Sequence, residues 1–159
     1  MRNVFAFTFW LTAKSMSDWP ELKRRIREKF PTVPHKSVAE AVALVDKALF
    51  LDTRSAAEFA VSHLPGARHT PDLASAQAAL KTRAPGQLAL LYCSVGYRSA
   101  QLAASLLALG EAQLVNLEGS LFEWVNEGHA LAAQKTLAHP FNKNWSGLLR
   151  RDRWSHVPT

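Results

Sequence analysis

Three short apolar runs alternate with stretches typical of helices, and this alternation limits the possible folds more than any other feature. The runs occupy residues 48–51, 88–92 and 114–117. Strands without a polar side are typical of parallel sheets, because helices cover both faces of such a sheet. The sequence therefore predicts an α/β fold, a parallel sheet flanked by helices on both faces. In such sheets, ligands bind beyond the carboxyl ends of the strands.

Capping patterns predict where several helices begin. A serine followed three residues later by a glutamate occurs at Ser37, Ser55 and Ser120, and such a capping box typically opens a helix. Pro20 fits the first turn of an earlier helix, and Gly110 fits the end of a later one. Further helices are predicted over residues 18–30, 72–81 and 99–109.

The length of 159 residues and the hydrophobic content of 48% suit a single compact domain with additional segments at its ends. We expect the basic C-terminal tail, residues 132–159, to wrap around the domain and to bury Phe141, Trp145 and Leu148. The alternative is that this tail recognises a partner protein. The predicted segments are an apolar N-terminal extension (1–15), an N-terminal helix and linker (16–36), the α/β domain (37–131) and a basic C-terminal tail (132–159).

The N-terminal extension resembles the core of a short signal peptide, because Arg2 precedes an apolar stretch over residues 4–11. That stretch is too short to cross a bilayer as a helix. The residues after it match a cleavage site poorly, and Met16 would open an ordinary cytosolic N-terminus. We therefore expect no membrane span and a cytoplasmic protein, with export as the alternative if residues 1–15 act as a signal sequence.

The formal net charge is +6, with basic residues gathered over residues 23–29 and 150–153. Such an excess can attract nucleic acid or anionic substrates. A solvated basic face is the simpler interpretation, since the middle of the chain is nearly balanced, and no nucleic-acid partner is expected. A single cysteine excludes an intramolecular disulfide and a cysteine-rich zinc site. We expect neither a metal nor another cofactor.

The single cysteine, Cys93, follows the apolar run 88–92. A lone cysteine after a strand is commonly a core residue, but its neighbours favour a reactive one. Gly96 permits a tight turn that can aim backbone N–H groups at an anion. The start of the next helix and the charge of Arg98 favour the thiolate further. Such surroundings lower the pKa of a cysteine from about 8.5 to roughly 3.5–7.5, which makes it a nucleophile at neutral pH.

The run Cys-Ser-Val-Gly-Tyr-Arg-Ser, residues 93–99, resembles the active-site loop of the rhodanese sulfurtransferase family. Two further landmarks agree in order. Leu-Asp-Thr-Arg at residues 51–54, with Glu58-Phe59 and then residues 63–67, resembles the N-terminal signature of the family. Asn-Leu-Glu-Gly at residues 116–119, followed by Trp124 and Gly128, resembles its C-terminal signature. The resemblance covers residues 37–131 and departs from the family pattern at Ser62 and Glu118.

This resemblance implies a fold that agrees with the one predicted from the apolar runs. It also implies a sulfurtransferase in which Cys93 takes the outer sulfur of a donor such as thiosulfate and becomes a persulfide. A thiophilic acceptor, cyanide or a thiol, then removes that sulfur. The implied catalytic residues are Cys93 and Arg98, and the implied substrate-binding residues are Ser94, Val95, Gly96, Tyr97 and Ser99.

Asp52, Arg54 and His63 are interpreted as supporting residues. Asp52 and Arg54 suit a structural ion pair at the strand end better than direct chemistry, and His63 suits the ordering of a turn. Trp124 is interpreted as core. Ser99 has two open interpretations, a helix cap or a contact to substrate. The expected partners are a small anionic sulfur donor and an acceptor that is a thiol or a protein.

Two other classes of function remain open. A noncatalytic rhodanese-like module could sense sulfide or dock a partner, although such a module needs neither Cys93 nor Arg98. Cysteine-dependent phosphatases and arsenate reductases have similar loops with five residues between the cysteine and the arginine. Here four residues, 94–97, separate Cys93 from Arg98. The shorter loop and the absence of a second cysteine favour sulfur transfer.

Overall fold

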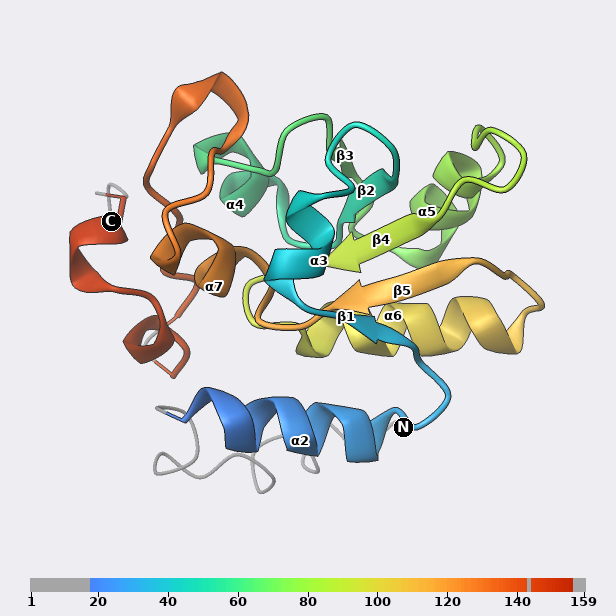
Figure 1. Cartoon of the computed structure of the whole chain (residues 1–159), viewed down its shortest axis with the longest axis horizontal. Coiled ribbons are helices and arrows are strands. Elements are labelled where there is room, and N and C mark those ends of the chain that lie inside the picture. Colours follow the sequence, from blue (N-terminus) through green and yellow to red (C-terminus); the bar gives the residue numbers. More distant parts are fainter. Residues whose placement is uncertain (1–17, 143, 156–159) are drawn as a thin grey trace.

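A computed structural model describes residues 18–142 and 144–155 and shows a five-stranded sheet (Figure 1). Every strand pair in the sheet is parallel, and the strand order is β1-β5-β4-β2-β3. The predicted α/β fold is therefore confirmed. The strands are β1 (His35–Lys36), β2 (Leu49–Asp52), β3 (Arg68–His69), β4 (Ala89–Tyr92) and β5 (Leu114–Leu117).

Helices alternate with the strands along the chain. None of those in the described part of the chain is both long and apolar enough to cross a membrane. The α-helices are α2 (Trp19–Lys29), α3 (Val38–Val42), α4 (Ala56–Val61), α5 (Leu73–Leu80), α6 (Tyr97–Ala108) and α7 (Ser120–Asn126). Short 3₁₀ helices follow at η2 (Ala132–Gln134), η3 (Ser146–Leu148) and η4 (Arg151–Arg153).

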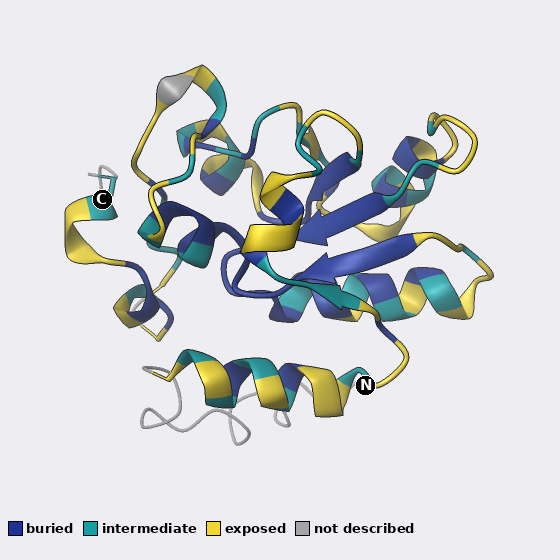
Figure 2. Cartoon of the chain, viewed as in Figure 1, coloured by how far each residue is buried: buried dark blue, intermediate teal, exposed yellow. Residues whose placement is uncertain are grey.

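The sheet has a hydrophobic core on each face, because successive side chains of a strand point to opposite sides. In β2, Phe50 packs in a cluster with residues of α2, α3, α7 and the C-terminal segment. Its neighbours Leu49 and Leu51 pack in the other cluster, with α5 and α6. The central strands are buried along their whole length (Figure 2). This two-sided burial is why these strands read as apolar runs, apart from the buried polar residues Asp52 in β2 and Asn116 in β5.

Two of the three predicted capping boxes are confirmed. Ser37 and Ser55 each accept a hydrogen bond from the N–H of the glutamate three residues later, and each glutamate bonds back. The third prediction, at Ser120, is wrong. Gly119 is the N-cap of α7 there, and the Ser120 hydroxyl donates to Leu117 O at 2.8 Å. The physical reason is that this hydroxyl also accepts the N–H of Cys93 at 3.2 Å.

Helix α6 begins at Tyr97 rather than at Ser99, so the helix cap, one of the two interpretations left open for Ser99, is wrong. Gly96 is the N-cap, with φ of +105°. Strands β1 and β3 were not predicted, since two residues each give no periodicity to read. The segment 16–36 therefore supplies an edge strand as well as a helix. The predicted extension 1–15 lies outside the described residues.

The C-terminal segment packs against the carboxyl ends of the strands. The arrowheads of β4 and β5 point toward α7 and this segment (Figure 1). Trp145 and Leu148 are buried, as expected from wrapping, whereas Phe141 is only partly buried. The segment therefore lies where ligands bind in sheets of this kind.

Candidate active site

Cys93 stands directly after β4, at the carboxyl end of a central strand. The loop that follows is fixed against the start of α7. Leu121 N–H donates to Cys93 O at 3.1 Å, and Phe122 N–H donates to Ser94 O at 3.0 Å. A side chain at Gly96 would need a left-handed backbone, and its Cβ would lie 3.2 Å from Leu117 O. The loop therefore requires glycine at this position.

The Cys93 sulfur is buried and receives polar contacts from its own loop and helix. Gly96 N–H donates to Sγ at 3.1 Å, and the Ser99 hydroxyl lies 3.5 Å from Sγ while donating to Asn116 Oδ1 at 2.6 Å. Burial alone would raise the pKa of Cys93. The charge of Arg98 and the hydrogen bonds from Ser99 and Gly96 outweigh it, so the pKa lies below its usual value. The site therefore favours the thiolate, the nucleophilic form.

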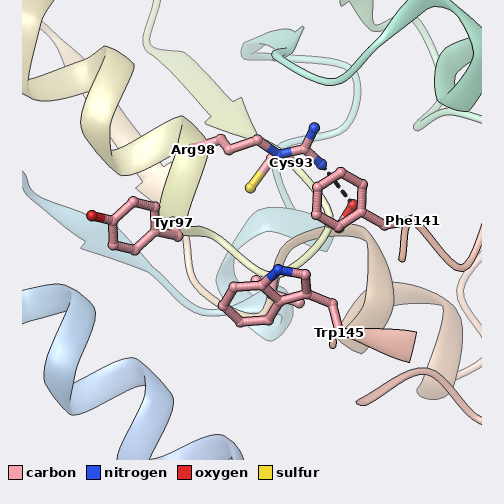
Figure 3. A pocket seen from close by; sticks show the side chains of 7 residues that line it. Cys93, Tyr97, Arg98, Phe141 and Trp145 are labelled. Atoms are coloured by element: carbon pink, nitrogen blue, oxygen red, sulfur yellow. Dashed lines mark hydrogen bonds between the residues drawn. The ribbon is translucent and has the colours of Figure 1, made fainter. Parts of the chain in front are cut away.

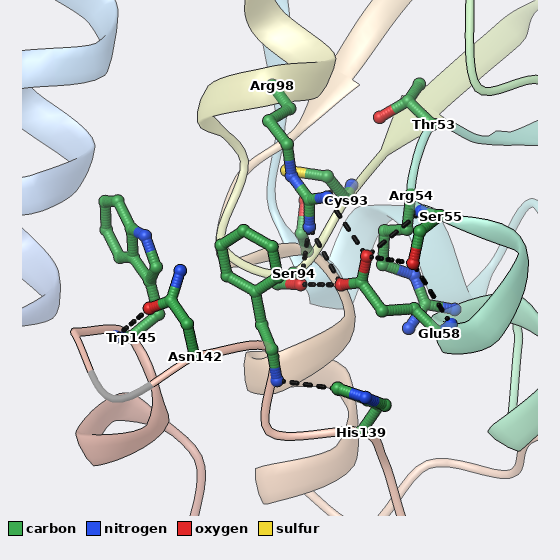
Figure 4. A network of polar contacts seen from close by, with 12 residues as sticks. Thr53, Arg54, Ser55, Glu58, Cys93, Ser94, Arg98, His139, Asn142 and Trp145 are labelled. Atoms are coloured by element: carbon green, nitrogen blue, oxygen red, sulfur yellow. Dashed lines mark hydrogen bonds and ion pairs between the residues drawn. The ribbon is translucent and has the colours of Figure 1, made fainter. Parts of the chain in front are cut away.

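Arg98 is held by a buried carboxylate that the sequence did not single out as a site residue. Its two terminal nitrogens donate to the two oxygens of Glu58 at 3.1 and 2.9 Å (Figure 4). Ser94 Oγ donates to the same carboxylate at 3.0 Å. Burial would raise the pKa of Glu58, but Arg98 and the capping bonds from Ser55 lower it to about 2. Glu58 therefore stays ionised and fixes the direction of Arg98.

Glu58 was recognised in the sequence only as the glutamate of a capping box and of a family signature. The signal that could have identified it is positional. Its helix starts just after β2, and β2 is the hydrogen-bonded neighbour of β4. The carboxyl ends of two adjacent parallel strands lie at the same edge of a sheet, so the capping carboxylate lies near the Cys93 loop.

A pocket of about 30 Å³ lies over the sulfur. The Cys93 sulfur points into the space bounded by Tyr97, Arg98, Phe141 and Trp145 (Figure 3). Neither Phe141 nor Trp145 was predicted as a site residue, because both come from the C-terminal segment and no pattern links them to the loop. The residues that line the pocket are Cys93, Ser94, Val95, Tyr97, Arg98, Phe141 and Trp145.

The other predicted loop residues have mixed surroundings. Val95 and Tyr97 line the pocket and also pack in the core cluster that contains α2. The ring of Tyr97 meets that of Phe30 edge-on, with centroids 5.2 Å apart. Gly96 supplies the turn, and Ser99 contacts the sulfur from the first turn of α6.

The predicted supporting residues surround the end of β2. Asp52 and Arg54 form a fully buried ion pair, with Arg54 Nη2 2.6 Å from Asp52 Oδ2. Arg54 also donates to Ser62 O at 2.7 Å, which ties the strand end to the end of α4. His63 stacks on Phe59 with ring centroids 3.9 Å apart, and its Nδ1 lies 3.0 Å from Phe59 O. These contacts suit the structural interpretation.

Glu118, where the family pattern is broken, lies at the end of β5 and ties α2 to the domain. Its carboxylate accepts two hydrogen bonds from the Arg27 guanidinium. In a neighbouring ion pair, Lys23 Nζ donates to Glu123 Oε1 at 2.7 Å. Much of the basic charge of α2 is thus engaged within the molecule. Among the described residues, no group of three His, Cys, Asp or Glu side chains is arranged to hold a metal ion.

Comparison with known proteins gives a family match and a fold match. A family model described as the rhodanese-like domain matches residues 37–127. No curated protein matches the chain. Among solved structures, a rhodanese-like domain protein from Staphylococcus aureus is 23% identical with a TM-score of 0.51, covering 60% of this chain and 95% of that one.

Two further solved structures show how widely this fold is used. The thiosulfate sulfurtransferase of Pseudomonas aeruginosa is 22% identical with a TM-score of 0.61 and covers 77% of this chain, but only 23% of that chain is matched. A Rhodopseudomonas palustris protein of unknown function, named as a possible tyrosine phosphatase, is 18% identical with a TM-score of 0.57, covering 82% of this chain and 98% of that one. At these identities the likeness shows the fold alone.

Proposed function

Because this chain belongs to the rhodanese-like domain family, we propose that it is a sulfurtransferase that carries sulfane sulfur as a persulfide on Cys93. The observation that carries the proposal is the environment of the sulfur. A lowered thiol pKa, an N–H aimed at Sγ and an arginine in the same pocket suit a nucleophile that must hold negative charge. A core cysteine needs none of these features.

The first half-reaction is written with thiosulfate as the reference donor. The Cys93 thiolate attacks the outer sulfur, and a new S–S bond forms to Sγ. The bond between the two sulfurs of thiosulfate breaks, and sulfite leaves with the electron pair. The persulfide anion lies where Gly96 N–H and the guanidinium of Arg98 can stabilise it, with the N-terminus of α6 adding partial positive charge.

The second half-reaction restores the thiolate. Cyanide or the thiolate of an acceptor attacks the outer sulfur of the persulfide, and Cys93 leaves as the thiolate. One cysteine is sufficient for this cycle, so the reaction should show ping-pong kinetics. Asp52, Arg54 and His63 are proposed to support the strand end and turn without entering the chemistry.

The noncatalytic and phosphatase alternatives predict different behaviour of the same thiol. A docking module does not need a thiol whose pKa is lowered by a guanidinium. A phosphatase loop would have to surround a tetrahedral phosphate, and the loop between Cys93 and Arg98 has four residues where the phosphatase loops have five. Hydrolysis of an aryl phosphate that disappears in Cys93→Ser would favour the phosphatase.

The deciding experiment is intact mass spectrometry after incubation with a sulfur donor. Thiosulfate and cysteine hydropersulfide should be used in parallel, so that the result does not depend on one donor. The wild type should gain one sulfur atom that cyanide removes, and Cys93→Ala should gain none. No gain from either donor would leave the noncatalytic module as the better interpretation.

A further inference from the structure

Two aromatic side chains outside the matched family residues close one side of the pocket. Phe141 and Trp145, here called the aromatic wall, both line it. The segment that carries them is anchored to the domain. Asn126, at the end of α7, donates from its side-chain nitrogen to Leu148 O at 2.7 Å, and its oxygen accepts Arg150 N–H at 2.9 Å. These two bonds hold the segment on both sides of Leu149, a buried core residue.

Each ring of the aromatic wall is fixed individually. Phe141 lies over Arg98, with its ring centroid 4.0 Å from the guanidinium carbon (Figure 3), a favourable cation–π contact. Its backbone has φ of +65°, and its N–H donates to His139 Nδ1 at 2.9 Å. Trp145 is 4% exposed and belongs to the core cluster. The wall therefore limits the shape of what can reach Sγ.

The space left over the sulfur is small. A volume of about 30 Å³ accommodates roughly two water-sized groups. A hydropersulfide carries a single substituent on the sulfur next to the one that reacts, so it needs little room beside the rings. A sulfonyl group carries three substituents around its sulfur besides the outer sulfur, and it needs more room there.

The charge in the pocket disfavours a dianion as well. Among the described residues that line the pocket, Arg98 is the only cation. Both of its terminal nitrogens are already engaged by Glu58, whose carboxylate stays ionised. With Cys93 as the thiolate, two anions face one cation before any donor arrives. Thiosulfate would add two more negative charges, whereas an organic hydropersulfide adds one or none.

We propose that the aromatic wall makes Cys93 selective for slender organic hydropersulfides, R–S–SH, over branched sulfonyl donors such as thiosulfate. The inference rests on the proposed sulfurtransferase function and names its donor class. The Cys93 thiolate attacks the terminal sulfur, the S–S bond of the donor breaks, and RS⁻ leaves with the electron pair. The proton of the terminal SH passes to RS⁻, giving the Cys93 persulfide anion and the thiol RSH.

The test compares three donors by the rate constant of sulfur gain at Cys93, measured by intact mass spectrometry. Cysteine hydropersulfide is slender. Thiosulfate and methanethiosulfonate are both branched, and methanethiosulfonate carries one charge fewer, so it separates shape from charge. The variants are Phe141→Ala, Trp145→Ala and the milder Trp145→Leu, which guards against loss of folding. Leu137→Ala, an exposed position in the same segment, is the matched control.

The wild type should load from cysteine hydropersulfide at least roughly tenfold faster than from either branched donor, the scale on which a pocket discriminates between substrates of different shape. The wall variants should reduce that ratio by accelerating the branched donors, and Leu137→Ala should leave it unchanged. Thermal unfolding separates this effect from lost folding, and the pH dependence of alkylation by iodoacetamide separates it from an altered thiolate pKa.

Two outcomes overturn the inference while leaving the sulfurtransferase intact. One is a wild type that loads from a branched donor as fast as from the hydropersulfide. The other is a donor ratio that stays constant in every folded wall variant. If no donor loads the wild type, the proposed function itself fails, and the two failures are thereby distinguished.

Discussion

At the scale of single residues, the site depends on how one guanidinium is shared. Arg98 donates to both oxygens of Glu58, and its charge also lowers the pKa of Cys93. Glu58 is buried, so its negative charge is poorly screened by water. It orients Arg98 toward the pocket and at the same time offsets part of the charge that stabilises the thiolate. Glu58 is thus a positioning residue that sets how acidic the thiol becomes.

Glu58→Gln should lower the pKa of Cys93 further, because Arg98 then faces the thiolate without a competing carboxylate. The variant should also be less stable, by about 1–3 kcal/mol, since a buried charged hydrogen-bond partner is lost. The pH dependence of Cys93 alkylation by iodoacetamide measures the first effect, and denaturant unfolding measures the second.

A matched control exists in the chain. Glu40 occupies the same position in the Ser37 capping box that Glu58 occupies in the Ser55 box, but it is exposed. Glu40→Gln removes the charge of a capping carboxylate without touching Arg98, and it should leave the alkylation profile of Cys93 unchanged. A rise in the pKa of Cys93 in Glu58→Gln would mean that Arg98 turns away when the carboxylate is lost, which would contradict the sharing described above.

The pKa of Glu58 also predicts how stability depends on pH. Its value of about 2, against an ordinary 4.5, means that the folded state prefers the ionised form. The stabilisation is therefore complete above about pH 4.5 and is lost as the pH falls toward 2, amounting to about 3 kcal/mol over that interval. The free energy of unfolding of the wild type should approach that of Glu58→Gln across this range. A difference that stays constant from pH 7 to 2.5 would contradict the low pKa.

The residues of the site differ in how far the sequence predicts them. Cys93, Gly96 and Arg98 belong to one continuous loop, so a local pattern was enough to bring them together. Glu58 reaches the loop through the pairing of β2 with β4, and Phe141 reaches it through the path of the C-terminal segment. Such long-range contacts are decided by packing, which a single sequence does not display.

At the scale of elements, α2 and β1 extend the domain beyond the family match. β1 pairs with β5 at the edge of the sheet. Leu22 and Ile26 of α2 are buried in the core cluster that also holds Val95 and Tyr97 of the active-site loop. The face of α2 could be predicted from the spacing of its apolar residues, but its position beside the loop could not. Two ion pairs, Arg27 with Glu118 and Lys23 with Glu123, hold α2 in that position.

Ile26→Ala should therefore cost about 2–5 kcal/mol of folding free energy, the usual range for truncating a buried isoleucine. Arg24→Ala on the exposed side of the same helix should cost much less than that, because its ion pairs with Glu21 and Glu28 are solvent-exposed. Denaturant unfolding of both variants measures the comparison. Equal and small costs would show that α2 is not part of the folding unit.

At the scale of the whole molecule, one core cluster joins three parts of the chain. It contains residues of α2, of the matched domain and of the C-terminal segment, including Leu149. Elements that share a core generally unfold together in a domain of this size. The C-terminal segment both covers the pocket and contributes to this core, so covering Cys93 and folding the domain should be parts of one event.

Leu149→Ala tests that coupling. Leu149 is 2% exposed and is not one of the residues that line the pocket, so the substitution removes core packing while both residues of the aromatic wall are kept. It should destabilise the protein by about 2–5 kcal/mol, and Cys93 should become open to alkylation at the same denaturant concentration at which far-ultraviolet circular dichroism reports loss of helix. Coincident transitions mean that the segment unfolds with the domain. If Cys93 becomes reactive at a clearly lower denaturant concentration, the C-terminal segment detaches first and the single shared core is disproved.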